Sequence, residues 1–378
     1  MLAIAPISPA NEHTKAPKEF LFMANRSKAG DSLPEYYLVY FLLVELLAFR
    51  NLGKWEKLDW SVPIDFKGKA FLVEHRKFGV GVFVQDPDLD EPAARDIVTL
   101  IRKGVDIAQP FFVWMADKAV NESKVNVTNE SIPLFQRYNY FVQKYRELQE
   151  EINNRADERI VEEGTSEDGT KWSTVSIPAF ALRRESQWVA QAAIDAFFSW
   201  TEHVLIHLAI IFGRLTTGRQ VAKLAVANWH EKFALTLDLA DAETKQFYDK
   251  LSAIRTQLRN FMAHGAFGKR GEAFHFHSGA GAVPVLLSET RGKYALSLTG
   301  QLAFEEHIAL DTIQQFIEFL WSGVRAPARV YIQESSLPLL LTMASDGTYA
   351  KAMTSPEEMA DFVYEMSCRF DNAANMDW

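Results

Sequence analysis

An arginine, an asparagine and a histidine lie within six residues of one another in the run Leu-Arg-Asn-Phe-Met-Ala-His-Gly, as Arg259, Asn260 and His264. An arginine guanidinium can hold a phosphate through two hydrogen bonds and stabilise the charge that grows on its oxygens. An imidazole, with a reference pKa of about 6.5, can accept or donate a proton near neutral pH. These are the groups that cleavage of an RNA phosphodiester needs when no metal ion takes part.

The spacing of apolar residues before this run predicts a helix that ends at it. Alternating intervals of four and three residues separate the members of one apolar stripe, which are Phe247, Leu251, Ile254, Leu258 and Phe261. Gly265 follows the histidine directly and is a favourable residue for ending a helix in a left-handed turn. We therefore expect a helix from about Asp241 to His264, with the histidine in its last turn.

One regular helix does not bring the arginine and the histidine together. Residues five apart differ by roughly 140° around the helix axis and by ~7.5 Å along it, so Arg259 and His264 point in different directions. Asn260 precedes His264 by four residues and shares its face. Either the helix unwinds at Gly265, or a second copy of the chain brings the same helix to one cleft about a two-fold axis. We favour the second arrangement, which predicts a homodimer.

The block from Leu258 to Gly265 resembles the signature of the HEPN superfamily, in which an arginine and a polar residue are followed by a histidine a few residues later. The resemblance covers roughly residues 185–325 and implies a four-helix bundle. Similar members are often dimeric, metal-independent endoribonucleases of toxin–antitoxin, phage-defence or RNA-processing systems. Other members have lost activity and serve as binding or scaffold domains. The resemblance therefore implies either an RNA-cleaving hydrolase or a non-catalytic module that binds a nucleotide, an RNA or a protein.

The resemblance also implies a role for each residue of the motif. His264 would handle the proton of the attacking 2′-hydroxyl or of the leaving 5′-oxygen, Arg259 would hold the phosphate, and Asn260 would orient the imidazole or donate to the phosphate. Attack by the 2′-hydroxyl leaves a 2′,3′-cyclic phosphate. Further contacts to the RNA backbone are expected from Arg255, Lys269 and Arg270.

One other interpretation of these residues remains open. An arginine, an asparagine and a histidine near a helix C-terminus can simply cap carbonyls and complement the helix dipole, in a protein with a purely structural role.

Glu202 and His203, on the preceding long helix, are candidates for orienting the imidazole. His203 and His207 have the spacing of two metal ligands on one helix face, but the sequence identifies no third ligand. We therefore predict no metal site and no cofactor.

Around the motif the sequence predicts four helical segments. They run from about Glu185 to Phe212, from Arg219 to Leu237, from Asp241 to His264 and from Phe304 to Gly323. Short links place the first three antiparallel, and β-like pieces precede the fourth, at Ala273–His277, Val283–Leu287 and Tyr294–Leu298. The expected fold class is mainly α: an HEPN-like antiparallel four-helix bundle with a small β insertion, preceded by a small α+β region.

Composition and turn residues predict four regions, which are a flexible arm (1–33), an N-terminal α+β and helical region (34–180), the bundle (181–326) and a C-terminal strand and helix packed on the body (327–378). Within the second region we expect a helix (36–49), a hairpin (70–74 with 80–85), a helix (91–108), a polar surface loop (116–131), a long helix (133–163) and a linker (164–170). The last region is expected to hold a strand near 330–332 and a helix near 356–370.

Bulk properties bound the partners and the compartment. The formal charge of −9 excludes a generally basic surface for nucleic acids but allows a local basic groove. A single cysteine, Cys368, cannot form an intramolecular disulfide, which favours the reducing cytoplasm. The apolar stretch Ala193–Gly213 contains ionisable residues, Glu202 and His207 among them, so we expect a buried helix rather than a membrane span. The expected partners are RNA, a second copy of the chain and a regulatory protein, with no membrane.

Overall fold

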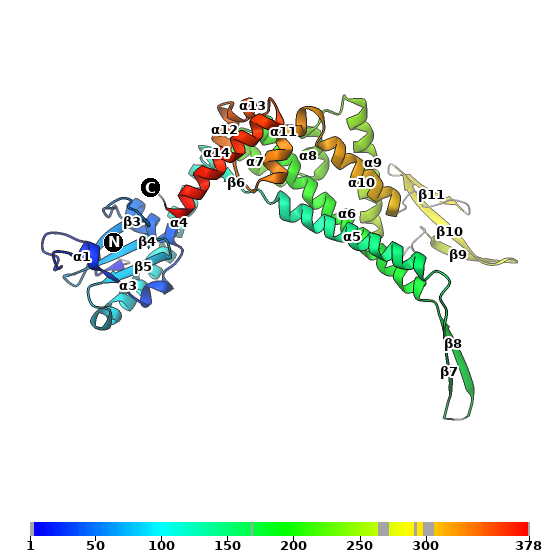
Figure 1. Ribbon diagram of the computed structural model, residues 1–378, viewed down its shortest axis with the longest axis horizontal. Coiled ribbons are helices and arrows are strands. Elements are labelled where there is room, and N and C mark those ends of the chain that lie inside the picture. Colours follow the sequence, from blue (N-terminus) through cyan, green and yellow to red (C-terminus); the bar gives the residue numbers. More distant parts are fainter. Residues whose placement is uncertain (1–3, 168, 264–271, 291–292, 298–305, 377–378) are drawn as a thin grey trace. The chain divides into compact units, whose positions relative to one another are not determined.

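Helices dominate the computed structural model, which describes residues 4–167, 169–263, 272–290, 293–297 and 306–376. The chain is 60% helix and 17% strand, which confirms the prediction of a mainly α protein. Its contacts divide it into two compact units (Figure 1). One consists of Met1–Lys124 with Tyr364–Trp378, and the other of Val125–Val363.

The first unit is built on a five-stranded antiparallel sheet in the order β1-β3-β4-β5-β2. The strands are β1 (Ile7–Pro9), β2 (Asn25–Arg26), β3 (Leu58–Phe66), β4 (Lys69–Arg76) and β5 (Gly79–Val84). The helices are α1 (Phe20–Met23), η2 (Ala29–Ser32), α2 (Tyr36–Tyr40), the π-helix η3 (Phe41–Leu46), α3 (Pro87–Ile107) and α4 (Gln109–Asn121). Alternate residues of the central strands are buried with one face of α3, and together they form the core of this unit.

Three predictions for this unit are confirmed and two are wrong. The helix expected at 36–49 is α2 continued by η3. The expected hairpin is β4–β5, and the helix expected from Glu91 is α3, which begins earlier because Asp86 caps its first turn. Residues 1–33 are not a flexible arm, since β1 pairs with β3, and Ile4 and Ile7 are 1% and 3% exposed. Their apolar side chains contribute to the core, which overrides the irregular local sequence. The stretch 116–131 is not all loop, because α4 continues to Asn121.

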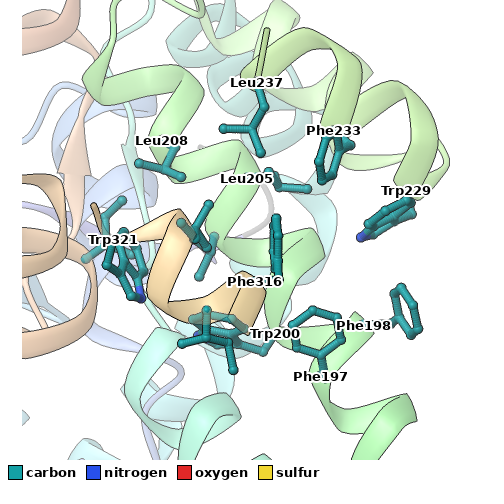
Figure 2. Close-up of a cluster of buried hydrophobic side chains, with 14 of the residues drawn as sticks. Phe197, Phe198, Trp200, Leu205, Leu208, Trp229, Phe233, Leu237, Phe316 and Trp321 are labelled. Carbon is teal, nitrogen blue, oxygen red and sulfur yellow. The ribbon is translucent and has the colours of Figure 1, made fainter. Parts of the chain in front are cut away.

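The second unit has an aromatic core between long helices. Its principal helices are α5 (Ser131–Asn154), α6 (Pro178–Ile211), α7 (Gly218–Ala225), α8 (Trp229–Thr236), α9 (Ala242–Ala263) and α10 (Glu306–Leu320). Figure 2 shows side chains of α6, α8 and α10 meeting in this core, among them Phe197, Trp200, Trp229, Phe233 and Phe316. Phe197, Phe198 and Trp200 of α6 are thus core residues.

Three of the four predicted bundle helices correspond to α6, α9 and α10, whereas the second is broken. Residues expected to form one helix from Arg219 to Leu237 form α7 and α8, because Asn228 has an extended backbone and its side chain accepts the N–H of Glu231. This is an N-terminal capping arrangement, and it begins a new helix. The expected β insertion is present as an antiparallel sheet of β9 (Glu272–Ser278), β10 (Gly281–Thr290) and β11 (Lys293–Ser297).

The segment between α5 and α6 differs most from the prediction. The helix expected to reach Glu163 ends at Asn154, and β7 (Ile160–Thr165) pairs antiparallel with β8 (Lys171–Ser176) in place of a plain linker. The ring of Trp172 covers Gly164, where an added Cβ would come within 2.4 Å of it. Gln149 on α5 donates to Ser186 on α6 at 2.6 Å, and the two helices pack along each other. For this reason the second unit begins at Val125, and residue 180 lies inside it.

The last part of the chain is almost entirely helical. Its elements are η4 (Gly323–Arg325), α11 (Ala326–Arg329), the π-helix η5 (Val330–Glu334), α12 (Leu341–Ser345), α13 (Thr348–Ala352) and α14 (Pro356–Asn375). A short strand β12 (Leu339–Leu340) pairs with β6 (Asn126–Val127). The strand predicted at residues 330–332 is wrong, because this β-prone run continues α11 and buries Tyr331 and Ile332 in a helical conformation. The predicted final helix is confirmed as α14.

Within the described part of the chain, α6 alone is long and apolar enough to cross a membrane, judged by length and composition. Of its apolar stretch, 72% is buried inside the protein. A core helix passes the same test, and the expectation that the chain has no membrane partner stays a prediction.

Candidate functional site

The helix that carries the first part of the motif is present, as the sequence predicts. α9 includes positions 259 and 260, and Ala263 is its last described residue. His264, Lys269 and Arg270 lie outside the described residues, as do the side chains of Arg259 and Asn260. The convergence of these groups on one phosphate therefore stays a prediction, while the helix that positions them is described.

The predicted apolar stripe anchors α9 in the bundle through its first four residues; the side chain of Phe261 lies outside the described residues. Leu251, Ile254 and Leu258 are buried, and the ring of Phe247 packs against Phe316 and Phe319 of α10, with centroids 5.7 and 4.9 Å apart. Burial of this stripe fixes which side of α9 faces the core. The opposite rotation of the helix would expose these side chains to water.

A charged cluster ties α9 to α6 and α8. One carboxylate oxygen of Glu202 accepts from Arg255 Nη2 at 2.9 Å, and the other accepts from Lys232 Nζ at 2.7 Å. The Arg255 guanidinium also lies over the rings of Phe198 and Trp229, at 5.5 and 5.8 Å from their centroids. Glu202, one of the two residues predicted to orient the imidazole, thus pairs with Arg255 of α9, which lies one turn before Arg259.

This cluster gives Arg255 a structural position. Its side chain is 33% exposed and its guanidinium is held by Glu202. A contact from its exposed part to RNA stays a prediction. Lys232, whose side chain is only 5% exposed, was not identified from the sequence. A signal was present, since it shares one helix face with the buried Trp229, Phe233 and Thr236.

Replacing Glu202 by alanine is expected to lower the free energy of unfolding by about 2–4 kcal/mol, because the buried Lys232 ammonium loses its carboxylate. Urea denaturation of the full chain measures the change. Glu147→Ala, a change of an exposed glutamate on α5, is the matched control and is expected to stay within about 0.5 kcal/mol of wild type. Combining Glu202→Ala with Lys232→Met is expected to recover much of the loss, since no charge is then buried alone. Equal effects of Glu202→Ala and Glu147→Ala would contradict this account.

His203 and His207 contact the segment before α5 instead of α9. Nε2 of His203 accepts the backbone N–H of Glu130 at 2.9 Å. The ring nitrogens of His207 lie 2.8 Å from the His203 carbonyl oxygen and 3.0 Å from that of Thr128. The expectation that His203 orients an imidazole on α9 therefore gains no support from its contacts. Across the described residues, no group of three or more His, Cys, Asp or Glu side chains is arranged to hold a metal ion.

Burial keeps this histidine pair neutral. It lowers the pKa of His203 to about 3, with a smaller contribution from neighbouring His207. Burial also lowers the pKa of His207, against the opposing effect of its two carbonyl neighbours. Protonation of His203 would in addition remove the lone pair that accepts the Glu130 N–H. The native state therefore resists protonation of both rings.

Acidification below about pH 6.5 is expected to destabilise the second unit. The unfolded chain then binds protons that the two histidines do not bind in the native state. The free energy of unfolding therefore falls by up to about 1.4 kcal/mol per pH unit for each histidine. Urea denaturation between about pH 7 and pH 5 measures this slope. His203→Gln, whose amide oxygen can still accept the Glu130 N–H, is expected to show a smaller slope. Identical slopes in the two proteins would show that His203 titrates normally in the native state.

No family model, curated protein or solved structure matches this chain. A function is therefore inferred from the residues and contacts of the chain itself.

Proposed function

We propose that this protein is a metal-independent endoribonuclease of HEPN type that acts in the cytoplasm as a homodimer. The observation that carries the proposal is that Arg259 and Asn260 lie in the last described turn of α9, with His264 following closely in the sequence. The helices α6, α7 with α8, α9 and α10 support it, since the resemblance implies a four-helix bundle. A toxin or phage-defence role is the setting that the same resemblance suggests.

The proposed reaction needs only groups of the chain and the RNA. The 2′-oxygen attacks the adjacent phosphorus, its proton passes to His264, and the bond from phosphorus to the 5′-oxygen breaks. The leaving oxygen takes up a proton, from a second imidazole or from water, and the products are a 2′,3′-cyclic phosphate and a 5′-hydroxyl. Arg259 stabilises the negative charge on the phosphoryl oxygens during this step, and Asn260 orients the imidazole or donates to the phosphate.

The rotation of α9 bears on how the site is assembled. Arg255 marks the side of α9 that meets α6, and position 259, one turn later, lies on nearly the same side. Position 260, which shares a face with 264 on a regular helix, is roughly 140° away from Arg255 around the axis. Position 259, which carries the arginine, and position 260, which shares a face with the histidine position, thus lie on different sides of α9. This favours a cleft that two chains complete together.

The alternative is a non-catalytic HEPN-like module that binds a nucleotide, an RNA or a protein. One observation favours it: Arg255, a basic residue expected on the path of the RNA, is held by Glu202 within the bundle. A module of this kind would retain binding without cleavage.

Cleavage of labelled single-stranded RNA by the full chain, in the presence of EDTA, tests the proposal. We expect fragments that end in a 2′,3′-cyclic phosphate, which acid treatment opens to a mixture of 2′- and 3′-phosphates. Binding of RNA without cleavage would favour the non-catalytic module. Neither binding nor cleavage would overturn both.

A further inference from the structure

The first turns of α6 carry exposed aromatic and basic side chains in a regular pattern. Phe180, Arg184 and Trp188 follow one another at intervals of four residues, so they share one side of the helix. The side chains of Phe180 and Trp188 are each 61% exposed. The guanidinium of Arg183 lies 5.9 Å from the Phe180 ring centroid, and that of Arg184 lies 5.9 Å from the Trp188 centroid. We call Phe180, Arg183, Arg184 and Trp188 the α6 stripe.

This part of α6 packs against α5 through its other side. Ala179, Ser186 and Ala190 are buried, and Ser186 accepts the hydrogen bond from Gln149 of α5. On a regular helix Ala179 and Ser186 lie roughly 100° and 120° from Phe180, and Ala190 lies roughly 80° from it, while Arg184 is on the opposite flank of Phe180. Arg183 lies between Phe180 and these buried positions. The aromatic rings of the stripe are therefore not part of the α5–α6 contact, which explains their exposure.

The stripe continues the side of α6 that contacts α9. Phe180 precedes Phe198 by 18 residues, and Arg184 precedes Glu202 by the same number. Eighteen residues make about five whole turns, so each pair lies on one side of a regular helix. Phe198 and Glu202 are the residues of α6 that hold Arg255 of α9.

The C-terminal direction of α9 points toward the part of α6 that carries the stripe. Tyr248 of α9 packs against Phe233, whose helix α8 hydrogen-bonds Leu205 of α6 through Thr236. Arg255, later in α9, meets α6 earlier in its sequence, at Phe198 and Glu202. The two helices therefore run antiparallel, and α9 ends toward the beginning of α6. Rises of ~12 Å from Arg255 to Ala263 and ~15 Å from Phe198 to Trp188 put Trp188 near the level of Ala263, the last described residue of α9, with Phe180 ~12 Å further along α6.

The charges of the stripe call for an anionic partner. In the described part of the chain, neither Arg183 nor Arg184 forms an ion pair with a carboxylate, and each is held only over a ring. Two exposed acidic residues lie near the stripe, Glu185 beside Arg184 and Asp195 between the stripe and Glu202. The two rings are separated by guanidinium groups, so the stripe lacks the continuous apolar centre of a protein interface. Exposed aromatic faces alternating with arginines are instead what single-stranded nucleic acids bind, through base stacking and phosphate contacts.

We propose that the α6 stripe binds a single strand of RNA, with bases stacked on Phe180 and Trp188 and phosphates held by Arg183 and Arg184. This inference rests on the proposed function for the identity of the nucleic acid, and it adds a binding track that leads to the end of α9. Because paired bases cannot stack on protein rings, the stripe selects unpaired RNA over duplex.

The test is RNA binding by the full chain carrying His264→Ala, so that cleavage does not interfere. Fluorescence anisotropy with a labelled single strand of about 16 nucleotides measures the dissociation constant, and the matching duplex serves as a competitor. Trp188→Ala is expected to weaken binding at least about fivefold through the lost stacking. Arg184→Ala is expected to weaken it too, and to reduce the slope of log K against log salt by about 0.7.

Trp114 and Lys118 of α4 provide a matched control. This tryptophan is 54% exposed and has an ammonium 5.3 Å from its ring centroid, so it has the same chemistry on an unrelated helix. Trp114→Ala and Lys118→Ala are expected to leave RNA binding unchanged. Unchanged binding in Trp188→Ala and Arg184→Ala, or equal losses in the controls, overturns the proposal. So does a change in self-association, measured by sedimentation, at constant RNA affinity, because the stripe would then be a protein interface.

The outcome separates this inference from the proposed function. If RNA binding depends on the stripe but the wild-type chain does not cleave RNA, the proposed binding site is supported and the proposed nuclease activity is contradicted. Cleavage by the wild type with no effect of Trp188→Ala or Arg184→Ala on affinity would do the reverse.

Discussion

Replacing His264 by alanine is expected to reduce the rate of RNA cleavage by about 100- to 10,000-fold, the range that a general acid or base contributes. Replacing Arg259 by alanine is expected to reduce it by about 100- to 1,000-fold, because charge on the phosphoryl oxygens then loses its guanidinium. Initial rates on a labelled single strand in EDTA measure both effects. Because no step uses a metal ion, added Mg²⁺ is not expected to restore either variant.

Matched controls separate chemistry from stability. His13→Ala removes a histidine that is 87% exposed in the first unit, and Arg95→Ala removes an exposed arginine of α3. Both are expected to cleave like wild type, and circular dichroism should show the same helix content in all four variants. Full cleavage by both His264→Ala and Arg259→Ala would leave the motif as a helix-capping element with no part in catalysis.

Mixing the two inactive variants is expected to restore activity. In a dimer of one Arg259→Ala chain and one His264→Ala chain, a cleft completed by both chains would have one intact Arg259–His264 combination and one with neither group. Random exchange makes half of the dimers mixed, and each has one of two clefts intact. The mixture should therefore reach about a quarter of the wild-type rate.

The result depends on subunit exchange, which can be followed with two differently sized tags before the rates are measured. Each variant incubated alone under the same conditions should stay inactive. If subunits exchange and activity does not return, Arg259 and His264 act within one chain, and α9 must depart from regular geometry after Ala263 to let them meet.

The sequence predicts the elements whose patterns are strong and local. The four-three spacing that starts at Phe247 identifies α9, and the alternating residues of β4 and β5 identify their hairpin. The hairpin of β7 and β8 was missed because Glu162 and Glu163 continue the polar, helix-favouring composition of α5, and neither strand has a buried face. Ile4 and Ile7 could not be assigned to a core without knowing that β1 joins the edge of a sheet formed later in the chain.

The candidate site likewise combines features that the sequence alone predicts with features that only the fold reveals. The motif and its helix are local features, and the sequence suffices to find them. The ion pair of Arg255 with Glu202 joins residues 53 positions apart, so only the packing of α9 on α6 reveals it. The significance of Phe180 and Trp188 likewise depends on which side of α6 meets α9, and helical periodicity alone does not specify this.

Glu202 carries one negative charge but receives two cations, Lys232 and Arg255. With Arg183, Arg184, Glu185 and Asp195, this side of α6 keeps an excess of one positive charge in a chain whose formal net charge is −9. A strand of RNA is repelled by the rest of the surface and attracted here, so its diffusion toward the protein is oriented before any contact forms. Selectivity would then arise partly in the encounter itself, with an association rate that falls as ionic strength rises.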